Sequence, residues 1–339
     1  MTKLIDPFGR EITYLRVSVT DRCNLRCIYC MPEEGVKLKS HSDILRIEEL
    51  ARIVNIASGL GITRVRLTGG ETLVRQGILA LVSLLSEIPG ICDLSMSTNG
   101  VLLSKFATRL SQAGLNRVNV SLDTLKPERF KRITRHGKLE SVLAGLEAAE
   151  GAGLSPIKIN TVVMKGVNHD EIRDLAMLTK DHPWIVRFIE FMPFWNNGWK
   201  FGAGYVMPIS EIRNEMIARG AYVINPNAGE NNQRDQAGKG PANYIKFPEF
   251  KGSIGFISLR DHICSNCNRI RLTADGLLLP CLLSNISVDL RTPLRDGADD
   301  GFIAGLIRKA VSLKPENGEI AQVEVACSGG NPSLSKIGG

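Results

Sequence analysis

The sequence contains little that would suit a membrane protein, a disordered chain or a secretory protein. No apolar run among its 339 residues approaches the roughly 18 residues of a transmembrane helix. Aromatic residues make up only 6% of the chain, yet 43% of residues are hydrophobic and 23% are charged, which excludes disorder. The length of 339 residues predicts two or three domains with buried cores. The first ten residues contain charges and no continuous apolar stretch, so we expect neither a secretory signal nor a mitochondrial leader. These features predict a cytoplasmic protein without a membrane partner.

The sequence also lacks long basic tracts. Its 42 basic and 35 acidic residues give a net charge of +7, a modest excess of Lys and Arg. Nucleic acid is therefore not an expected partner. A solvated basic surface or a smaller anionic ligand would account for the excess.

The eight cysteines do not form a disulfide framework, because thiols in the cytoplasm are kept reduced. Cys92 and Cys327 stand alone, and we expect both to be small buried side chains. The other cysteines form two groups of three: Cys23, Cys27 and Cys30, and Cys264, Cys267 and Cys281.

Short apolar strands alternate with amphipathic helices through the first two thirds of the chain. Strands are predicted over residues 14–20, 64–67, 93–98, 117–122, 157–163 and 185–191. Helices are predicted over residues 47–60, 76–88, 104–113, 139–152 and 170–180. This repeat predicts an α/β fold, an incomplete (βα)6 TIM-like barrel with informative polar residues after its strands.

A polar stretch rich in Gly and Asn, residues 225–243, interrupts this alternation. We therefore expect one domain over residues 1–225 and a second over residues 226–339. The second is expected to be an α+β region, with strands over residues 244–247 and 253–258.

The spacing C-x3-C-x2-C of the first group can hold one metal centre. Structural zinc takes four protein ligands, and the nearest further candidate, His41, is distant in sequence. A four-iron cluster held by three cysteines keeps one iron open for a small ligand, which suits catalysis.

The segment CNLRCIYC, residues 23–30, resembles the signature of the radical S-adenosylmethionine (SAM) enzymes, including Tyr29 before the last cysteine. The resemblance implies a [4Fe-4S] cluster on these three cysteines and a partial barrel of the radical SAM type. In that family the open iron binds SAM, and an electron from the cluster splits SAM to give a 5′-deoxyadenosyl radical.

The same resemblance implies that SAM contacts follow several strands. Gly69, Gly70 and Glu71 match the family's GGE motif, although these glycines would also suit a plain tight turn. Thr72 stands where the family usually has proline. The implied SAM-binding residues are Tyr29, Gly69, Gly70, Glu71, Ser121, Asn160 and Met192. For Met192, ordinary core packing remains the alternative.

The second group, with spacing C-x2-C-x13-C, again supplies three thiolates. His262 could complete a zinc site, and a second cluster with an open iron is the other interpretation. Arg269 and Arg271 follow at once, and residues two apart on a strand face the same side. Such paired guanidinium groups suit phosphate oxygens, although a solvated pair on a surface strand is the alternative.

The segments CSNCNRIRLTADG, RVSVTDRCN, RVRLTGGE, NVSLDTL, KINTVVMKGVN, VRFIEFMP and the terminal Gly-Gly together resemble the GTP 3′,8-cyclase family of molybdenum cofactor biosynthesis. This resemblance runs from about residue 7 to residue 339. It implies conversion of GTP to (8S)-3′,8-cyclo-7,8-dihydroguanosine 5′-triphosphate, the first step of molybdopterin formation. The radical would remove the ribose 3′ hydrogen, and the resulting carbon radical would attack C8 of guanine. A second [4Fe-4S] cluster would bind the guanine.

The resemblance also implies a set of substrate residues. One arginine alone is more often a salt-bridged surface residue, but several cations on barrel strands are costly unless an anion meets them. The substrate-binding residues implied are Arg16, Arg66, Ser97, Lys158, Arg187, Arg269, Ile270 and Arg271. The catalytic residues implied are Arg269, Arg271, Gly338 and Gly339, with a disordered tail as the alternative for the two glycines.

The resemblance further implies a homodimer, a reductant such as flavodoxin or ferredoxin, and a downstream cyclic pyranopterin monophosphate synthase. One rival is another radical SAM enzyme with an auxiliary cluster, such as a peptide maturase, although such enzymes usually carry more extra cysteines. The second rival is a zinc-stabilised nucleotide-binding protein. Measured contents of iron, sulfide and zinc distinguish the zinc-stabilised protein from the cyclase.

Overall fold

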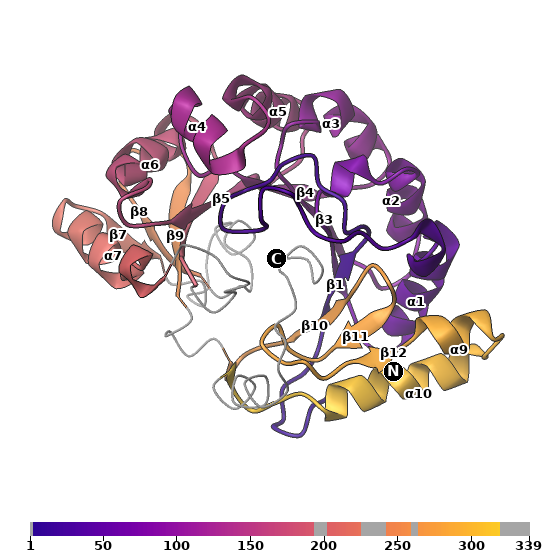
Figure 1. Ribbon diagram of the computed structural model, residues 1–339. Coiled ribbons are helices and arrows are strands. Elements are labelled where there is room, and N and C mark those ends of the chain that lie inside the picture. Colours follow the sequence, from indigo (N-terminus) through magenta and orange to yellow (C-terminus); the bar gives the residue numbers. More distant parts are fainter. Residues whose placement is uncertain (1–2, 193–201, 225–241, 259–263, 319–339) are drawn as a thin grey trace. The chain divides into compact units, whose positions relative to one another are not determined.

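A computed structural model describes residues 3–192, 202–224, 242–258 and 264–318. The chain forms two compact units. The first consists of residues 1–98, 105–116 and 264–339, and the second of residues 99–104 and 117–263. Residues 264–318 thus pack with the N-terminal part of the chain, and Figure 1 shows helix α10 beside helix α1, with which it is in contact.

The first unit is built on a sheet with strand order β12-β11-β10-β1-β2-β3. The strands β10, β1, β2 and β3 run parallel, and β11 and β12 are antiparallel to their neighbours. The strands are β1 (Tyr14–Ser18), β2 (Arg64–Thr68), β3 (Asp93–Thr98), β10 (Arg269–Leu272), β11 (Leu277–Leu279) and β12 (Val288–Asp289). The α-helices are α1 (Ile47–Gly59), α2 (Ile78–Ser86), α9 (Arg291–Arg295) and α10 (Asp300–Ser312), and α3 (Leu103–Gln112) crosses the unit boundary. Short 3-10 helices are η1 (His41–Asp43) and η2 (Thr72–Val74).

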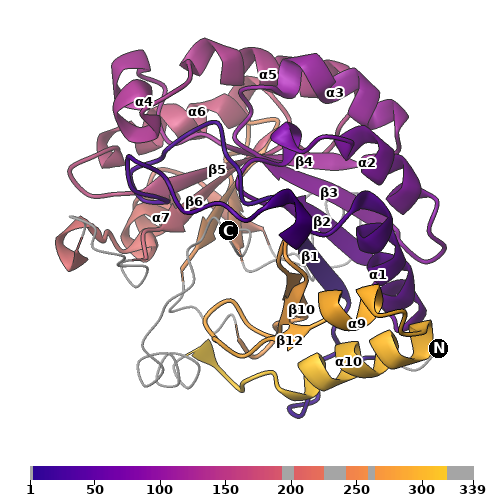
Figure 2. The same cartoon turned by 45° about the vertical axis from the view of Figure 1, so that its right-hand side comes forward.

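Local sequence explains the core of this unit. On β1, Leu15 and Val17 are fully buried, and the intervening Arg16 faces the other side, as strand alternation requires. Helix α1 begins with a capping interaction in which the Glu49 carboxylate accepts a bond from the Arg46 backbone N–H at 2.7 Å. Figure 2 shows α1 and α2 covering one side of the strands of this unit.

The second unit has the strand order β4-β5-β6-β9-β8-β7. Strands β4, β5, β6 and β9 are parallel, and β8 and β7 are antiparallel to their neighbours. The strands are β4 (Arg117–Ser121), β5 (Lys158–Val163), β6 (Ile185–Glu190), β7 (Tyr222–Ile224), β8 (Asn243–Lys246) and β9 (Ser253–Ile257). The helices are α4 (Pro127–Thr134), α5 (Leu139–Gly151), α6 (Ile172–Asp181) and α7 (Ile209–Ala218), with 3-10 helices η3 (His169–Glu171) and η4 (Ala203–Tyr205).

The predicted α/β fold with parallel strands is confirmed, and all six predicted strands of the first two thirds are present within a few residues. The sequence did not predict α4, whose eight residues carry four charged side chains and only a short apolar stripe. The expectation that Cys92 is buried is wrong. Its thiol is exposed and donates to the Thr63 carbonyl at 3.3 Å.

The predicted boundary near residue 225 falls in a segment outside the described residues and stays a prediction. In the described part of the chain, no helix is both long and apolar enough to span a bilayer.

Candidate active site

The first cysteine triad occupies the loop that follows β1, and all three side chains are half-buried. Cys30 N–H donates to the Cys27 carbonyl at 2.9 Å, which closes a turn between these two cysteines. Leu25 N–H donates to the sulfur of Cys23 at 3.4 Å, a contact that favours the thiolate form. The backbone of the loop thus closes the turn from Cys27 to Cys30 and contacts the sulfur of Cys23.

Burial holds the Cys30 thiol of this loop in its protonated form unless a metal binds it. Burial, together with the nearby Cys23, raises the pKa of the Cys30 thiol to about 12. A metal centre reverses that effect, because a coordinating thiol is deprotonated by the metal charge. Among the described residues, no three Cys, His, Asp or Glu side chains converge as ligands of a single ion. In a four-iron cluster each cysteine binds a different iron, so the three sulfurs need not converge on one point.

The GGE segment packs directly on the start of this cysteine loop. Gly70 N–H donates to the Thr20 carbonyl at 2.8 Å, and Glu71 N–H donates to the Arg22 carbonyl at 2.7 Å. A Cβ added at Gly69 would lie 2.6 Å from the Thr20 carbonyl oxygen, and one at Gly70 would lie 2.3 Å from that of Arg22. These glycines are therefore needed for close contact between two backbone segments, whatever ligand the loop receives.

Buried side chains then tie the GGE segment to β3. The Glu71 carboxylate, which is 1% exposed, accepts a bond from the Thr98 hydroxyl at 2.7 Å. The Thr72 hydroxyl donates to the Ser97 carbonyl at 2.7 Å. Thr72, where the family usually has proline, thus holds the segment by a hydrogen bond instead of a ring.

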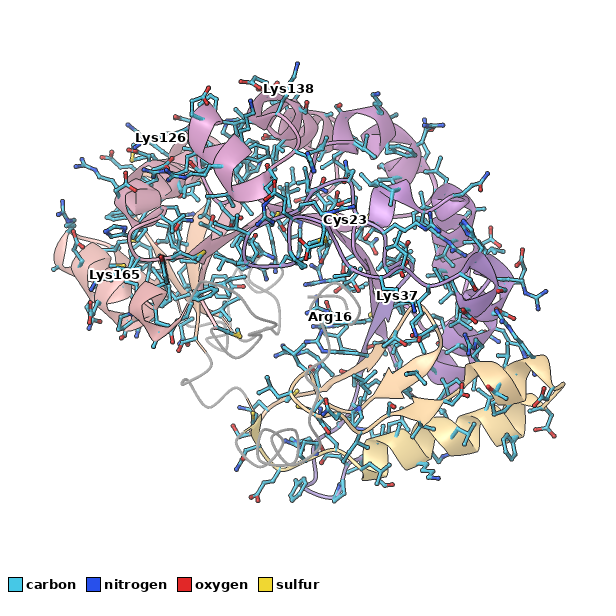
Figure 3. The ribbon with its side chains drawn as sticks, viewed as in Figure 1. Arg16, Cys23, Lys37, Lys126, Lys138 and Lys165 are labelled. Carbon is cyan, nitrogen blue, oxygen red and sulfur yellow. The ribbon has the colours of Figure 1, made fainter. Side chains whose placement is uncertain are left out.

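A row of polar side chains crosses the sheet of the first unit. Arg16 on β1 is in register with Arg271 on β10 and with Arg66 on β2, and Arg66 is in register with Ser95 on β3. Residues in register on neighbouring strands project to the same face. Arg66 Nε donates to the Ser95 hydroxyl at 3.3 Å. Figure 3 shows the Arg16 side chain pointing away from the helices that cover this part of the sheet.

These guanidinium groups repel one another. Burial, with Arg271 and Arg66 next, holds the pKa of Arg16 well below its usual value. Burial and the neighbouring Arg269 lower the pKa of Arg271 to about 10. A bound polyanion would remove this penalty, so the row has the charge of a phosphate-binding site.

The second cysteine triad lies at the other end of the strands of the same sheet, beside the start of β10. Cys264 and Cys267 directly precede β10, Cys267 N–H donates to the Cys264 carbonyl at 3.1 Å, and Cys281 follows β11. The sulfur of Cys281 accepts a bond from Leu283 N–H at 3.4 Å. Because β10 and β1 are parallel, the first triad follows the end of β1 and the second precedes the start of β10. The arginine row lies between these two ends of the strands.

Comparisons with known proteins agree with this arrangement. One family model, the Radical SAM superfamily, matches residues 17–179, and a second, Molybdenum Cofactor Synthesis C, matches residues 184–320. The GTP 3′,8-cyclase of Heliobacterium modesticaldum is 50% identical over 313 residues, which is 92% of this chain and 93% of that protein. This chain belongs to the GTP 3′,8-cyclase family. The GTP 3′,8-cyclase of Moorella thermoacetica is 49% identical over 311 residues, covering 91% of this chain and 93% of the relative.

A crystal structure of Streptococcus suis SuiB has a TM-score of 0.61 and 15% sequence identity, covering 89% of this chain and 69% of that protein. At that identity the likeness supports the fold alone. The resemblance to the GTP 3′,8-cyclase family, predicted from sequence motifs, is confirmed by the relatives.

The second unit of this cyclase-family chain carries its own polar row. Ser121 on β4 is in register with Asn160 on β5, and Asn160 with Arg187 on β6. The Asn160 amide oxygen accepts two bonds from Arg187, from Nε at 2.9 Å and from Nη2 at 2.6 Å. Lys158, two residues before Asn160 on the same face, is 5% exposed. Asn160, predicted as a SAM contact, therefore also orients the guanidinium of a predicted GTP contact.

The remaining predicted site residues have varied surroundings. Tyr29, Ser97 and Met192 are half-buried, while the Ile270 side chain is 1% exposed and alternates with Arg269 and Arg271 on β10. Outside the described residues lie Gly338, Gly339, His262 and Cys327.

Sequence reasoning missed residues that support the second triad. Burial alone would raise the pKa of Cys267, but the charges of Lys314 and Arg269 outweigh it and bring that pKa below its usual value. Burial raises the pKa of Cys281. Arg10 also contacts this region, through the Cys264 carbonyl at 2.8 Å. No local pattern marks Lys314 or Arg10, because their partners lie far away in the sequence.

Proposed function

We propose that this chain catalyses the reaction for which its relatives are named, the cyclisation of GTP to (8S)-3′,8-cyclo-7,8-dihydroguanosine 5′-triphosphate at the start of molybdenum cofactor biosynthesis. The observation that carries the proposal is the row Arg271–Arg16–Arg66, in register between two cysteine triads. A triphosphate carries about four negative charges near neutral pH, enough to offset three or four guanidinium groups.

The cofactors proposed are SAM and two [4Fe-4S] clusters. Membership of the radical SAM superfamily implies the first cluster, on Cys23, Cys27 and Cys30. The second, on Cys264, Cys267 and Cys281, is supported by the matching Cys281–Leu283 contact, which repeats the backbone-to-sulfur bond of the first loop. When bound, the reduced first cluster and SAM supply a radical that can take a hydrogen atom from carbon.

The protein residues act by positioning. The GGE segment is held against the cysteine loop, which fixes the place of any ligand carried there. Arg16 and Arg66 are proposed to bind the triphosphate, and Arg269 and Arg271 to bind substrate next to the second triad. Holding two reactants in one geometry lowers the entropic part of the barrier, by up to roughly 7–11 kcal/mol in well-oriented cases.

The other residue roles stay predictions that rest on the family resemblance. For the second unit they are SAM contacts by Ser121, Asn160 and Met192 and GTP contacts by Lys158 and Arg187. For the first unit they are a SAM contact by Tyr29, GTP contacts by Ser97 and Ile270, and catalytic contributions from Arg269, Arg271, Gly338 and Gly339. A homodimer, a flavodoxin or ferredoxin reductant, and the downstream synthase are proposed partners on the same ground.

Anaerobic incubation with SAM, dithionite and each nucleoside triphosphate in turn tests the function. Only GTP is expected to give a new product, an isomer of the substrate, with one 5′-deoxyadenosine formed per product. GTP carrying deuterium at C3′ should transfer that deuterium to 5′-deoxyadenosine, as mass analysis would show. Product from ATP alone, or deuterium that stays in the nucleotide, would contradict the proposal.

Metal analysis tests the cofactors separately. Two four-iron clusters predict about eight iron and eight sulfide per chain. Colourless protein with stoichiometric zinc would support the zinc-stabilised alternative instead.

A further inference from the structure

Lys314 is a buried ammonium that the proposed reaction does not use. It lies two residues beyond the end of α10 and is 3% exposed. Its Nζ donates to the carbonyls of Arg269 at 2.8 Å and Pro280 at 2.7 Å. Arg269 comes two residues after Cys267, and Pro280 directly precedes Cys281. One ammonium therefore joins the two segments that carry these cysteines.

Arg10 makes the corresponding connection to the remaining cysteine. It is 9% exposed, and its Nε is paired with the Asp6 carboxylate at 2.5 Å. Its Nη1 donates to the Cys264 carbonyl at 2.8 Å and to the Glu316 carbonyl at 2.7 Å. Its Nη2 donates to the Pro315 carbonyl at 2.6 Å. The guanidinium thus fastens Cys264 to the residues that follow Lys314.

Residues 314–318 are consequently linked to every cysteine segment of the second triad. A Cβ added at Gly318 would lie 3.8 Å from the sulfur of Cys264 and 2.6 Å from the Leu283 side chain. Gly318 is therefore packed against the Leu283 side chain, close to the sulfur of Cys264.

The charge of Lys314 calls for an explanation. Burying an ammonium is costly unless it is hydrogen-bonded and close to negative charge. Within the described residues Lys314 bonds to two neutral carbonyls and pairs with no carboxylate. The thiols of Cys267 and Cys281 lie beside it, and a cluster bound to them would hold both as thiolates and so supply negative charge.

We propose that Lys314 and Arg10 are positioning residues for the second metal centre. Lys314 acts through its positive charge, and Arg10 acts through its hydrogen bonds to three backbone carbonyls. The inference rests on the second cluster proposed above. It assigns the N-terminal residues 6–10 and the segment after α10 to the support of that centre.

The test uses the full chain with Cys23→Ser, Cys27→Ser and Cys30→Ser combined, so that only the second triad can hold a cluster. After anaerobic reconstitution, iron and sulfide are measured, and the midpoint potential is followed by electron paramagnetic resonance. Lys314→Met is compared with Lys309→Met, which changes an exposed lysine of α10. We expect Lys309→Met to match the background, with about four iron per chain. Lys314→Met should lose at least half of the iron, and the cluster that remains should have a more negative potential, because a nearby positive charge favours the reduced form.

Arg10→Lys separates geometry from charge. Lysine keeps the positive charge but cannot reproduce the several hydrogen bonds of the guanidinium, so we expect a lower iron content and an unchanged midpoint potential of the second cluster. If Lys314→Met fails to fold, Arg10→Lys alone decides, and full iron content in it overturns the inference. Equal iron content and equal potential in Lys314→Met and Lys309→Met would also overturn it. A background chain that takes up no iron, or takes up zinc, would refute the second cluster and this inference together, whereas iron in the background with no effect of Lys314 refutes the inference alone.

Discussion

The two cysteine triads are built in different ways within one unit. The first lies within eight consecutive residues and is held largely by its own backbone and the adjoining GGE segment. The second is drawn from two segments and is held by Lys314 and by Arg10. The backbone partners of Arg10 lie 254 and 306 positions away from it in the chain. The first triad is therefore a local motif, and the second depends on the fold of the whole unit.

Replacing one cysteine in each triad should give the largest effects on activity, and the two effects should differ from each other. Cys27→Ser removes a ligand of the first cluster, so cleavage of SAM should fall to background. Cys267→Ser should spare part of that cleavage, because the first loop does not depend on the second, yet cyclisation should be lost. Formation of 5′-deoxyadenosine and of cyclised nucleotide, measured in parallel, checks both outcomes. Normal cyclisation by Cys267→Ser would show that the second triad has no role in the reaction.

The arginine row between the triads provides the next test, with Arg16→Met. Loss of charged hydrogen bonds worth about 1.5–3 kcal/mol should weaken GTP binding by roughly 10- to 100-fold. Without GTP the same change should raise the thermal midpoint, because the half-buried Arg16 lies in register with Arg66 and Arg271 and its pKa is held well below normal. Calorimetry with and without GTP measures both. Arg109→Met, at an exposed position of α3, should change neither quantity, and a fall in the ligand-free midpoint of Arg16→Met would contradict the interpretation.

Gly70→Ala disturbs the packing of the GGE segment on the first cysteine loop and leaves the second triad unchanged. The added Cβ would meet the Arg22 backbone at 2.3 Å, so the two segments must separate, at a cost of about 1–3 kcal/mol. We expect the iron of the first cluster to be reduced while that of the second is kept. Gly59→Ala, where nothing lies within 4 Å of the new Cβ, is the matched control and should keep both clusters. Equal losses from both triads would show that the first is not an independent local unit.

The same contrast explains what sequence could predict. The α/β fold and the strand β1 follow from local patterns, such as the alternation of Leu15 and Val17 with Arg16. The cysteine spacing of the first loop is equally local. For the glycines, the family resemblance implied a role in binding SAM, whereas the structure shows contact of Gly69 and Gly70 with the backbone of the cysteine loop.

What sequence could not predict depends on register and long-range contact. The alignment of Arg16 with Arg66 and Arg271 requires the pairing of strands that are distant in the chain, and no local pattern contains it. A buried lysine such as Lys314 has no composition signal that distinguishes it from exposed lysines. The short helix α4 was missed because its charged sequence carries only a narrow apolar stripe.

A smaller effect tests whether the C-terminal segment is attached independently of its metal centre. Arg295 of α9 bonds to the buried Glu49 of α1 at 2.9 Å and 3.0 Å, and Arg46 bonds to the same carboxylate at 3.0 Å. Burial acts to raise the pKa of Glu49, but the hydrogen bonds from Arg295 and Arg46 outweigh it and bring that pKa to about 2, from 4.5. Between these two values the unfolded chain takes up a proton and the folded chain does not. Stability from this group is therefore complete above pH 4.5 and is lost as the pH falls toward 2.

Glu49→Gln should consequently lower the free energy of unfolding at pH 7 by roughly 2 kcal/mol, and the difference should shrink as the pH falls through 4 and 3. Urea denaturation of the metal-free chain measures this without interference from cluster loss. Glu215→Gln, which breaks the exposed pair with Arg219, should cost at most a few tenths of a kcal/mol at any pH. A pH-independent loss in Glu49→Gln would mean that packing of the side chain, rather than its ion pairs, attaches α9 to α1. If the loss follows the expected pH course, the ion pairs of Glu49 attach α9 to α1 before any metal binds, and this part of the C-terminal segment does not depend on the second cluster.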